Sequence, residues 1–293
     1  MAEIIQKDGT WSFDGDAVHI VPGRDKGVGL LRQTLGAVTV PLHAIAGVSH
    51  EPGRKAGRLR LRDGADPLLR VTAGRLPDSS DPYQLTVEPD RTGVAEYLVD
   101  EVRNALLLDQ VDAGPVATYL LPGPPVPLTV GAGDGTAAFD GSRVSLTWNW
   151  KTEEAKSSGG PRTFAVEDLA AVEWYPAMGL DNGYLRFTLA SATGSAPEPK
   201  YDPHSVELFG FKKDPLMALV AAAVAVRMPH PAAAPSGPAA EAALTKELDR
   251  APEGAQDHDA LLRRLRELGE LHQGGILTAD EFAAAKQAIL RRF

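Results

Sequence analysis

The sequence contains no cysteine, only four methionines and 6% aromatic residues, and its apolar runs are short. Without cysteine there can be no disulfide, thiolate zinc site, iron–sulfur cluster or cysteine nucleophile, and the composition fits a reducing cytoplasm. The longest apolar run, residues 216–226, has eleven residues, whereas a membrane-spanning helix needs about 20. We therefore expect a buried helix there. The first residues have no basic and apolar signal regions, so we expect a cytoplasmic protein.

Motifs of known chemistry are also missing. The seven histidines are scattered without metal-ligand spacing, and no G-x-S-x-G occurs. The glycine-rich residues 21–29 lack the G-K-[ST] ending of a phosphate loop and are typical of a hairpin turn. We therefore predict no catalytic residues, no metal, no cofactor and no enzyme activity. The net charge of −9 argues against a nucleic-acid partner.

What the chain does contain is an internal duplication. Residues 8–15 (DGTWSFDG) return as residues 134–141 (DGTAAFDG). The match continues in order, because residues 42, 45 and 48 align with apolar residues 166, 169 and 172, and residues 57–61 align with 183–187. A collinear series of this kind indicates two related domains rather than a chance match.

Within each copy the apolar residues alternate, which is typical of β-strands. Residues 10–13 and 17–21 flank the turn Asp14-Gly15, and residues 58–62 alternate leucine with arginine. We also predict strands at 38–42, 68–72 and 84–87, followed by a helix that begins at Thr92. About seven strands and one closing helix form the element order of a pleckstrin-homology (PH)-like domain, an analogy of fold only.

The predicted fold is therefore mainly β with some α: two tandem PH-like β-barrel or sandwich domains, each closed by a C-terminal helix. The predicted order is a first repeat over residues 1–110, a proline-rich linker over 111–127, a second repeat over 128–228, a flexible Ala/Pro linker over 229–256 and a small helical hairpin over 257–293.

The C-terminal hairpin carries apolar stripes on two short helices, the second opened by a capping box at 278–281. The predicted oligomerisation residues are Leu261, Leu265, Leu268, Leu271, Ile276, Phe282, Ile289 and Phe293. Two helices of this length cannot bury a self-sufficient core. The stripes must pack on copies of themselves, on another protein or on the β domains. The long linker favours copies of the chain, so we expect a homo-oligomer.

Basic residues gather in the first repeat. Residues 24–75 contain ten basic and four acidic side chains, whereas residues 148–200 contain five and seven. The candidate anion-binding residues are Arg54, Lys55, Arg58, Arg60 and Arg62. They could bind a phosphate-bearing ligand, an anionic lipid or an acidic partner, or they could form a solvated strand face that meets the acidic second repeat.

Two family resemblances follow from these motifs. Residues 265–286, with Leu265, Gly275, Thr278, Glu281 and Phe282 among the matching positions, resemble the short C-terminal (SHOCT) domain of bacterial proteins. The duplicated D-G-T-x-x-F-D-G unit resembles the actinobacterial domain-of-unknown-function 4429 family. These resemblances imply a PH-like fold, an actinomycete source and an oligomerising or scaffolding tail, and they imply no catalytic residues.

Taken together, the sequence predicts a non-enzymatic binding or scaffold protein whose PH-like modules are clustered by the self-associating hairpin. A protein partner fits this interpretation. The alternative function is a peripheral membrane protein that binds anionic lipid through the basic face of the first repeat.

Overall fold

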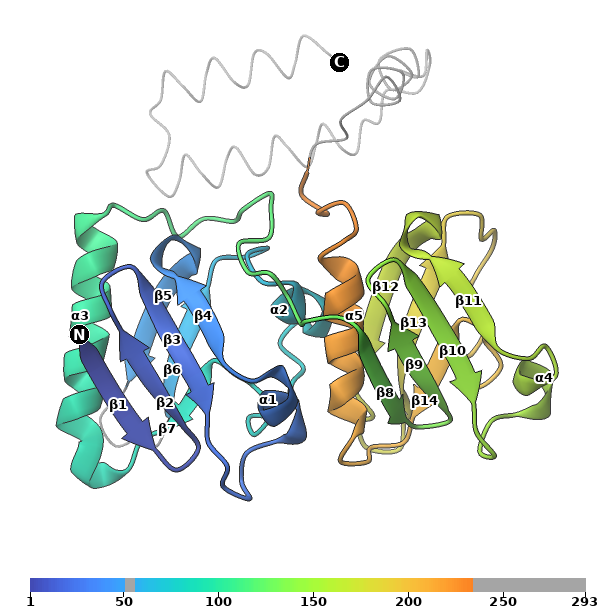
Figure 1. Cartoon of the computed structure of the whole chain (residues 1–293), viewed down its shortest axis with the longest axis horizontal. Helices are drawn as coiled ribbons and strands as arrows, with labels where there is room; N and C mark the ends of the chain where they lie inside the picture. Colours follow the sequence, from blue (N-terminus) through green and yellow to red (C-terminus); the bar gives the residue numbers. More distant parts are fainter. Residues whose placement is uncertain (51–55, 234–293) are drawn as a thin grey trace, which may run out of the picture. The chain divides into compact units, whose positions relative to one another are not determined.

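β-Strands pair into four antiparallel sheets in the part of the chain that the structure, a computed structural model, describes: residues 1–50 and 56–233 (Figure 1). The prediction of a mainly β chain with few helices is confirmed. Residues 1–233 form one compact unit that contains both repeats.

The first repeat pairs a four-stranded sheet with a three-stranded one, and a helix closes it. The larger sheet contains β1 (Ala2–Gln6), β2 (Gly9–Phe13), β3 (Ala17–Pro22) and β4 (Val38–Pro41), and the smaller one contains β5 (Ile45–His50), β6 (Ala56–Leu61) and β7 (Gln84–Thr86). The helices are α1 (Leu30–Leu35), α2 (Pro67–Thr72) and α3 (Thr92–Leu108), with short 3-10 turns at Leu42–Ala44 and Pro89–Arg91.

The second repeat has the same arrangement. Its four-stranded sheet contains β8 (Leu128–Ala132), β9 (Gly135–Phe139), β10 (Arg143–Trp148) and β11 (Arg162–Ala165), and its three-stranded sheet contains β12 (Leu169–Tyr175), β13 (Gly183–Leu189) and β14 (Ser205–Leu208). The helices are α4 (Glu154–Ser157) and α5 (Met217–Ala225), with 3-10 turns at Val166–Asp168 and Asp214–Leu216.

One predicted strand is wrong, because residues 68–72 form most of α2. The Asp66 side chain caps this helix and accepts hydrogen bonds from the Leu68 and Leu69 amides at 2.9 and 3.2 Å. Pro67 occupies the first helical turn, where its missing N–H costs nothing. The cap and the proline outweigh the β-branched and apolar pattern that suggests a strand.

The proline-rich residues 111–127 contain no helix or strand and pack on the first repeat. The Val116 amide donates to the Asp63 carbonyl at 2.8 Å, and the Leu120 amide donates to the Ala65 carbonyl at 2.8 Å. Leu121 is only 5% exposed and belongs to the first hydrophobic core. This segment therefore completes the core of the first repeat.

The first aspartate of the duplicated motif ties the two sheets of each repeat together. Asp8, in the β1–β2 turn, accepts a hydrogen bond from the Thr86 amide on β7 at 2.8 Å. Asp134, in the β8–β9 turn, accepts one from the Glu207 amide on β14 at 2.8 Å. The same aspartates face buried cations on α1 and α4. We call this arrangement the aspartate latch.

The cation of the latch differs between the repeats. The buried Arg32 side chain donates to the Asp8 carbonyl at 2.9 Å and lies 3.6 Å from its carboxylate. Lys156 Nζ donates to Asp134 Oδ2 at 2.6 Å, with both side chains at most 1% exposed. Burial raises the pKa of the Asp134 carboxyl, and the Lys156 ammonium opposes that shift.

The other motif residues also have structural roles. A side chain at Gly9 would begin 2.9 Å from the Val21 carbonyl oxygen, so only glycine fits. Phe13 is buried in the core. Asp14 Oδ1 accepts the Asp16 and Ala17 amides at 2.9 Å each and closes the β2–β3 turn. The corresponding residues of the second repeat make equivalent contacts, so the shared motif stabilises the same turns and core in both repeats.

Helix α5 joins the two repeats. All nine of its residues are buried, as expected for a helix that is apolar on every face. It packs on β8, β9 and β12 of its own repeat and on α2 of the first repeat (Figure 1). Leu31 and Leu68 of the first repeat belong to the same hydrophobic cluster as α5. The apolar run at 216–226 is therefore a shared core element, and the prediction of a buried helix there is confirmed.

The buried ion pair of the latch gives a first prediction. Replacement of Lys156 by Met should lower the free energy of unfolding by about 3–5 kcal/mol, because Asp134 would stay buried without its counter-ion. Urea unfolding at neutral pH measures this change. The double variant Asp134→Asn/Lys156→Met should recover part of the loss, and the exposed Arg143→Met should change stability by less than about 0.5 kcal/mol. A loss below about 1 kcal/mol in Lys156→Met would refute this role of the pair.

The shared core gives a second prediction. Trp11 in the first repeat and Trp174 in the second are each 2% exposed, so each reports on its own repeat. With the other tryptophans changed to Phe, the two single-reporter chains should unfold at the same urea concentration, because α5 couples both cores. Separate midpoints for the two reporters would show that the repeats unfold independently.

Candidate functional site

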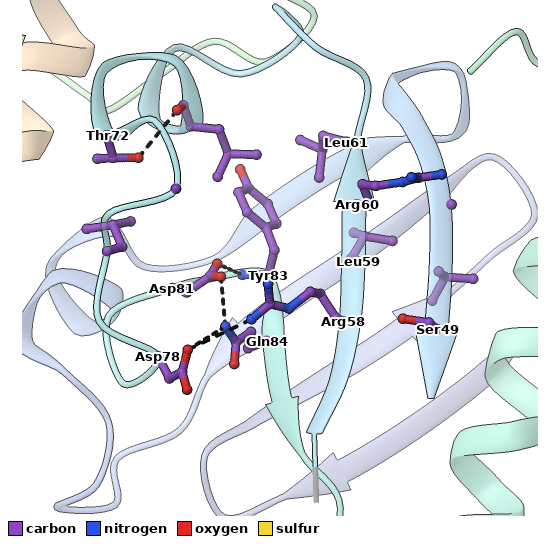
Figure 2. A pocket seen from close by; sticks show the side chains of 15 residues that line it. Ser49, Arg58, Leu59, Arg60, Leu61, Thr72, Asp78, Asp81, Tyr83 and Gln84 are labelled. Carbon is purple, nitrogen blue, oxygen red and sulfur yellow. Dashed lines mark hydrogen bonds and ion pairs between the residues drawn. The ribbon is translucent and has the colours of Figure 1, made fainter. Parts of the chain in front are cut away.

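A pocket of about 510 Å³ lies beside the middle strand of the smaller sheet in the first repeat (Figure 2). Strand β7 pairs with Ala56–Arg58, and the Leu59 amide donates to the Tyr83 carbonyl at 2.9 Å just before β7. The pairing on that side of β6 therefore ends at Leu59. Residues from β5, β6, α2 and the segment that leads into β7 form its walls. Two of the predicted anion-binding residues, Arg58 and Arg60, line this pocket.

Strand geometry explains why these two arginines lie together. Alternate residues of a strand point to the same face. Leu59 and Leu61 are 3% and 7% exposed and enter the core, while Arg58 and Arg60 lie exposed on the opposite face. The predicted alternation of inward leucines and outward arginines is therefore present in β6.

Carboxylates balance the positive charge of the pocket. Arg58 lies 3.8 Å from the Asp78 carboxylate, and the Gln84 amide donates to Asp78 and Asp81 at 3.0 and 3.1 Å (Figure 2). Arg60 donates to the Ala46 carbonyl at 3.4 Å. A pocket lined by two arginines and two aspartates, with Arg58 beside Asp78, suits a ligand with both donors and acceptors, such as a peptide segment, better than a highly charged anion.

The inner wall of the pocket contains a buried hydrogen bond. The Tyr83 hydroxyl donates to Asp66 Oδ2 at 2.7 Å, and both side chains are buried. Burial raises the pKa of the Asp66 carboxyl, and burial together with the neighbouring Asp66 charge raises the pKa of Tyr83. Asp66 also caps α2, so this pair holds α2 beside the pocket.

Arg62 does not line the pocket. Its guanidinium donates to the carbonyls of Gly114 and His43 at 2.8 and 3.1 Å and lies 3.7 Å from Asp112. It therefore holds residues 111–127 against the first repeat. Arg54 and Lys55 lie outside the described residues. So do all the predicted oligomerisation residues: Leu261, Leu265, Leu268, Leu271, Ile276, Phe282, Ile289 and Phe293.

Sequence reasoning does not identify the buried cations Arg32 and Lys156. A signal for them exists, because each precedes the aligned residues Leu42 and Val166 by the same number of positions. Among residues 1–50 and 56–233, no group of three or more acidic or histidine side chains could hold a metal ion. In the same ranges, none of the helices combines the length and apolarity needed to cross a bilayer.

Comparison with protein families agrees with the duplicated fold. Residues 11–103 and 137–225 each match the family described as Domain of unknown function (DUF4429), and together they cover more than half of the chain. The chain belongs to the DUF4429 family. The two matches coincide with the two structural repeats and confirm the family resemblance predicted from the D-G-T-x-x-F-D-G motif.

The end of the chain matches a second family. Residues 263–290 match the short C-terminal domain, SHOCT, which confirms the other predicted resemblance. No curated protein and no solved structure matches the chain. The family matches establish how the DUF4429 repeats and the SHOCT segment are arranged along the chain, and neither assigns a ligand.

The Asp66–Tyr83 pair gives a third prediction. Replacement of Tyr83 by Phe should lower the free energy of unfolding at neutral pH by about 1–3 kcal/mol, because a buried carboxylate loses a donor. The Tyr83 hydrogen bond lowers the pKa of Asp66, so its removal raises that pKa further. The loss belongs to the ionised carboxylate, and it should shrink as the pH falls through the pKa of Asp66.

Urea unfolding of the wild type and Tyr83→Phe at several pH values measures this effect. The exposed Tyr97→Phe serves as a matched control that should leave stability unchanged. If the Tyr83→Phe loss does not vary with pH, the hydroxyl acts through packing alone.

Proposed function

We propose that this protein is a non-enzymatic, cytoplasmic binding and scaffold protein. In this proposal the two DUF4429 repeats are PH-like modules that form one rigid binding body, and the SHOCT segment assembles several chains. Clustering then raises the overall affinity for a partner, because several weak contacts form at the same time. A protein partner fits the mixed donors and acceptors around the Arg58 pocket.

The arrangement of strands supports the PH-like assignment. Each repeat contains a four-stranded and a three-stranded antiparallel sheet followed by one closing helix, α3 or α5. This is the element order expected of PH-like domains, which serve as binding modules on many unrelated proteins.

The observation that carries the proposal is a difference between two groups of polar residues: those that the repeats share and those that differ between them. The aspartates of the duplicated motif are engaged inside the fold, as the latch and the turn bonds show. Other exposed polar groups lie on segments that differ between the repeats, such as the loop that contains Asp78. A common scaffold with different exposed loops is what a pair of binding modules requires.

The SHOCT segment supports assembly through its sequence. Its leucine and phenylalanine stripes would provide on the order of 8–12 kcal/mol of gross apolar burial if four or five side chains were covered. Two short helices cannot cover these stripes themselves. We therefore propose that copies of the chain cover them, with docking on another protein or on residues 1–233 as the other possible outcomes of the test.

Light scattering tests the assembly and gives a fourth prediction. The full chain should run well above the 31.1 kDa of one copy, and the variant Leu265→Asp/Leu268→Asp should fall to that mass. A charge placed within a buried apolar stripe costs several kcal/mol of desolvation free energy. This cost takes up much of the free energy of a micromolar association, so the assembly should dissociate.

The matched control is Arg263→Asp, which puts the same side chain on the face of the same predicted helix opposite the leucine stripe. It should keep the high mass. Deletion of residues 257–293 should abolish self-association as fully as the double variant. A full chain that runs as a single copy at high concentration would refute the scaffold proposal.

A further inference from the structure

One end of the second repeat exposes an unusual number of large apolar side chains. Trp150 is 88% exposed, Met178 59%, Leu180 103% and Phe211 55%. They come from three separate loops: β10–α4, β12–β13 and the connection from β14 to α5. We call these four residues the apolar tip.

Contacts among the loops show that the tip is one surface. Lys151 Nζ lies 4.6 Å from the centre of the Phe211 ring and 5.6 Å from that of Trp150, so it joins two of the loops. The β12–β13 loop lies beside the third, because the Ala177 methyl carbon is 3.6 Å from where a Gly210 side chain would begin. The Asn182 side chain also donates to Glu207 at 2.9 Å.

The backbone at Phe211 is fixed by a buried carboxylate. The amides of Gly210 and Phe211 donate to Asp214 Oδ2 at 2.7 and 3.0 Å, and Asp214 is 4% exposed. Gly210 has a φ of 83°, which favours glycine at this turn. The aromatic ring is therefore presented to solvent by a defined structure.

The first repeat provides an internal comparison. By the alignment of the repeats, Trp150 corresponds to Arg24, and both of these residues are exposed. The same fold is thus built with a charged residue at this place. A tryptophan is not needed there to fold the repeat, so Trp150 calls for a functional explanation.

A basic hollow lies next to the tip. A pocket of about 470 Å³ is lined by Lys151, Lys212 and Lys213 together with Phe211 and the glycines of the β8–β9 turn. Its acidic residue, Asp214, already accepts the two loop amides. The exposed acids on the loops that carry the tip and on the adjoining α4 are Glu153, Glu154 and Asp181. Three ammonium groups around a hollow favour a phosphate group.

We propose that the apolar tip inserts into the headgroup region of an anionic phospholipid bilayer, with the lysine hollow on the lipid phosphates. Tryptophan is the side chain most suited to the boundary between water and hydrocarbon, and lysine extends its ammonium to the phosphate level. Four apolar side chains spread over three loops also suit insertion into a fluid surface. This inference goes beyond the proposed scaffold function and rests on residues 1–233 alone.

The charge of the whole protein makes the test specific. A net charge of −9 opposes general adsorption to an anionic surface. Binding to such vesicles therefore requires a local site. The basic face of the first repeat is the competing location, and its Arg58 and Arg60 are the residues that separate the two sites.

Vesicle flotation of the full-length protein tests the proposal. Vesicles of equimolar phosphatidylglycerol and phosphatidylcholine should carry the wild type, and vesicles of phosphatidylcholine alone should carry much less. Trp150→Ala/Leu180→Ala should weaken partitioning at least about tenfold, because most of the inserted apolar area is lost. Lys212→Ala/Lys213→Ala should weaken it about tenfold or more at low salt.

Matched controls separate the tip from other surfaces. Tyr97→Ala/Leu107→Ala removes an aromatic and a leucine that are 54% and 76% exposed on α3, and it should bind like the wild type. Arg58→Ala/Arg60→Ala should also bind like the wild type. All variants should keep the wild-type mass in light scattering, so a failure of membrane binding is distinguishable from a failure of self-association.

Tryptophan fluorescence identifies the inserted residue. Brominated phosphatidylglycerol vesicles should quench the wild type more than Trp150→Phe, which keeps an apolar ring and should still float. Three outcomes would overturn the proposal: no flotation of the wild type, equal flotation of Trp150→Ala/Leu180→Ala, or loss of binding only in Arg58→Ala/Arg60→Ala. Full release by millimolar inorganic phosphate would also overturn it, because the hollow would then be a free-phosphate site.

Discussion

The fold of each repeat depends on a carboxylate that bridges its first hairpin and its last strand. Asp8 and Asp134 each lie in the turn of the first hairpin and accept the amide of the last strand at 2.8 Å. This contact joins residues that are far apart in the chain, so it closes the four-stranded sheet over the three-stranded one. A buried carboxylate needs a cation, and each repeat supplies one from the helix between its third and fourth strands. In each repeat, therefore, the aspartate that bridges the two sheets needs a cation beside it. Arg32 meets this need in the first repeat and Lys156 meets it in the second.

The second constraint is the burial of α5. A helix with only small and apolar residues must be covered on all sides. Strands β8, β9 and β12 of the second repeat cover part of α5, and helix α2 of the first repeat covers another part. The alanines of α5 allow the close approach. Because this core is shared, the repeats form a single compact unit, and separating them would expose the apolar surface of α5.

The sequence predicts well what depends on local pattern. The Asp14-Gly15 hairpin, the alternation in β6, the helix from Thr92 and the two family matches all follow from spacing or turn chemistry.

Prediction from sequence fails where a competing local signal is stronger, as in α2, where Asp66 and Pro67 decide the structure. It also fails for long-range partners, because nothing local in the sequence shows that Arg32 faces Asp8. Arg58 and Arg60 share a face as predicted, but only the fold shows that Asp78 lies beside Arg58 and that Arg60 donates to the Ala46 carbonyl. The sequence does not predict solvent exposure either. Trp150 and Trp174 both lie near strand ends, yet Trp150 is 88% exposed and Trp174 is 2% exposed.

The difference between the repeats indicates how such a protein could gain function after duplication. The residues that the two repeats share stabilise the fold, so their identities are restricted by the contacts they make. The loop sequences are not restricted in this way and can differ between the repeats. At one aligned place the first repeat has Arg24 and the second has Trp150. Under the proposed membrane contact, a single tip would bind a surface weakly, since few side chains are buried per chain. Several tips held together by a self-associating C-terminal segment would bind firmly, because each further contact is made at a high effective concentration. In the two proposals taken together, residues 1–233 would present the tip, the tip would contact the surface, and the SHOCT segment would supply the multiplicity.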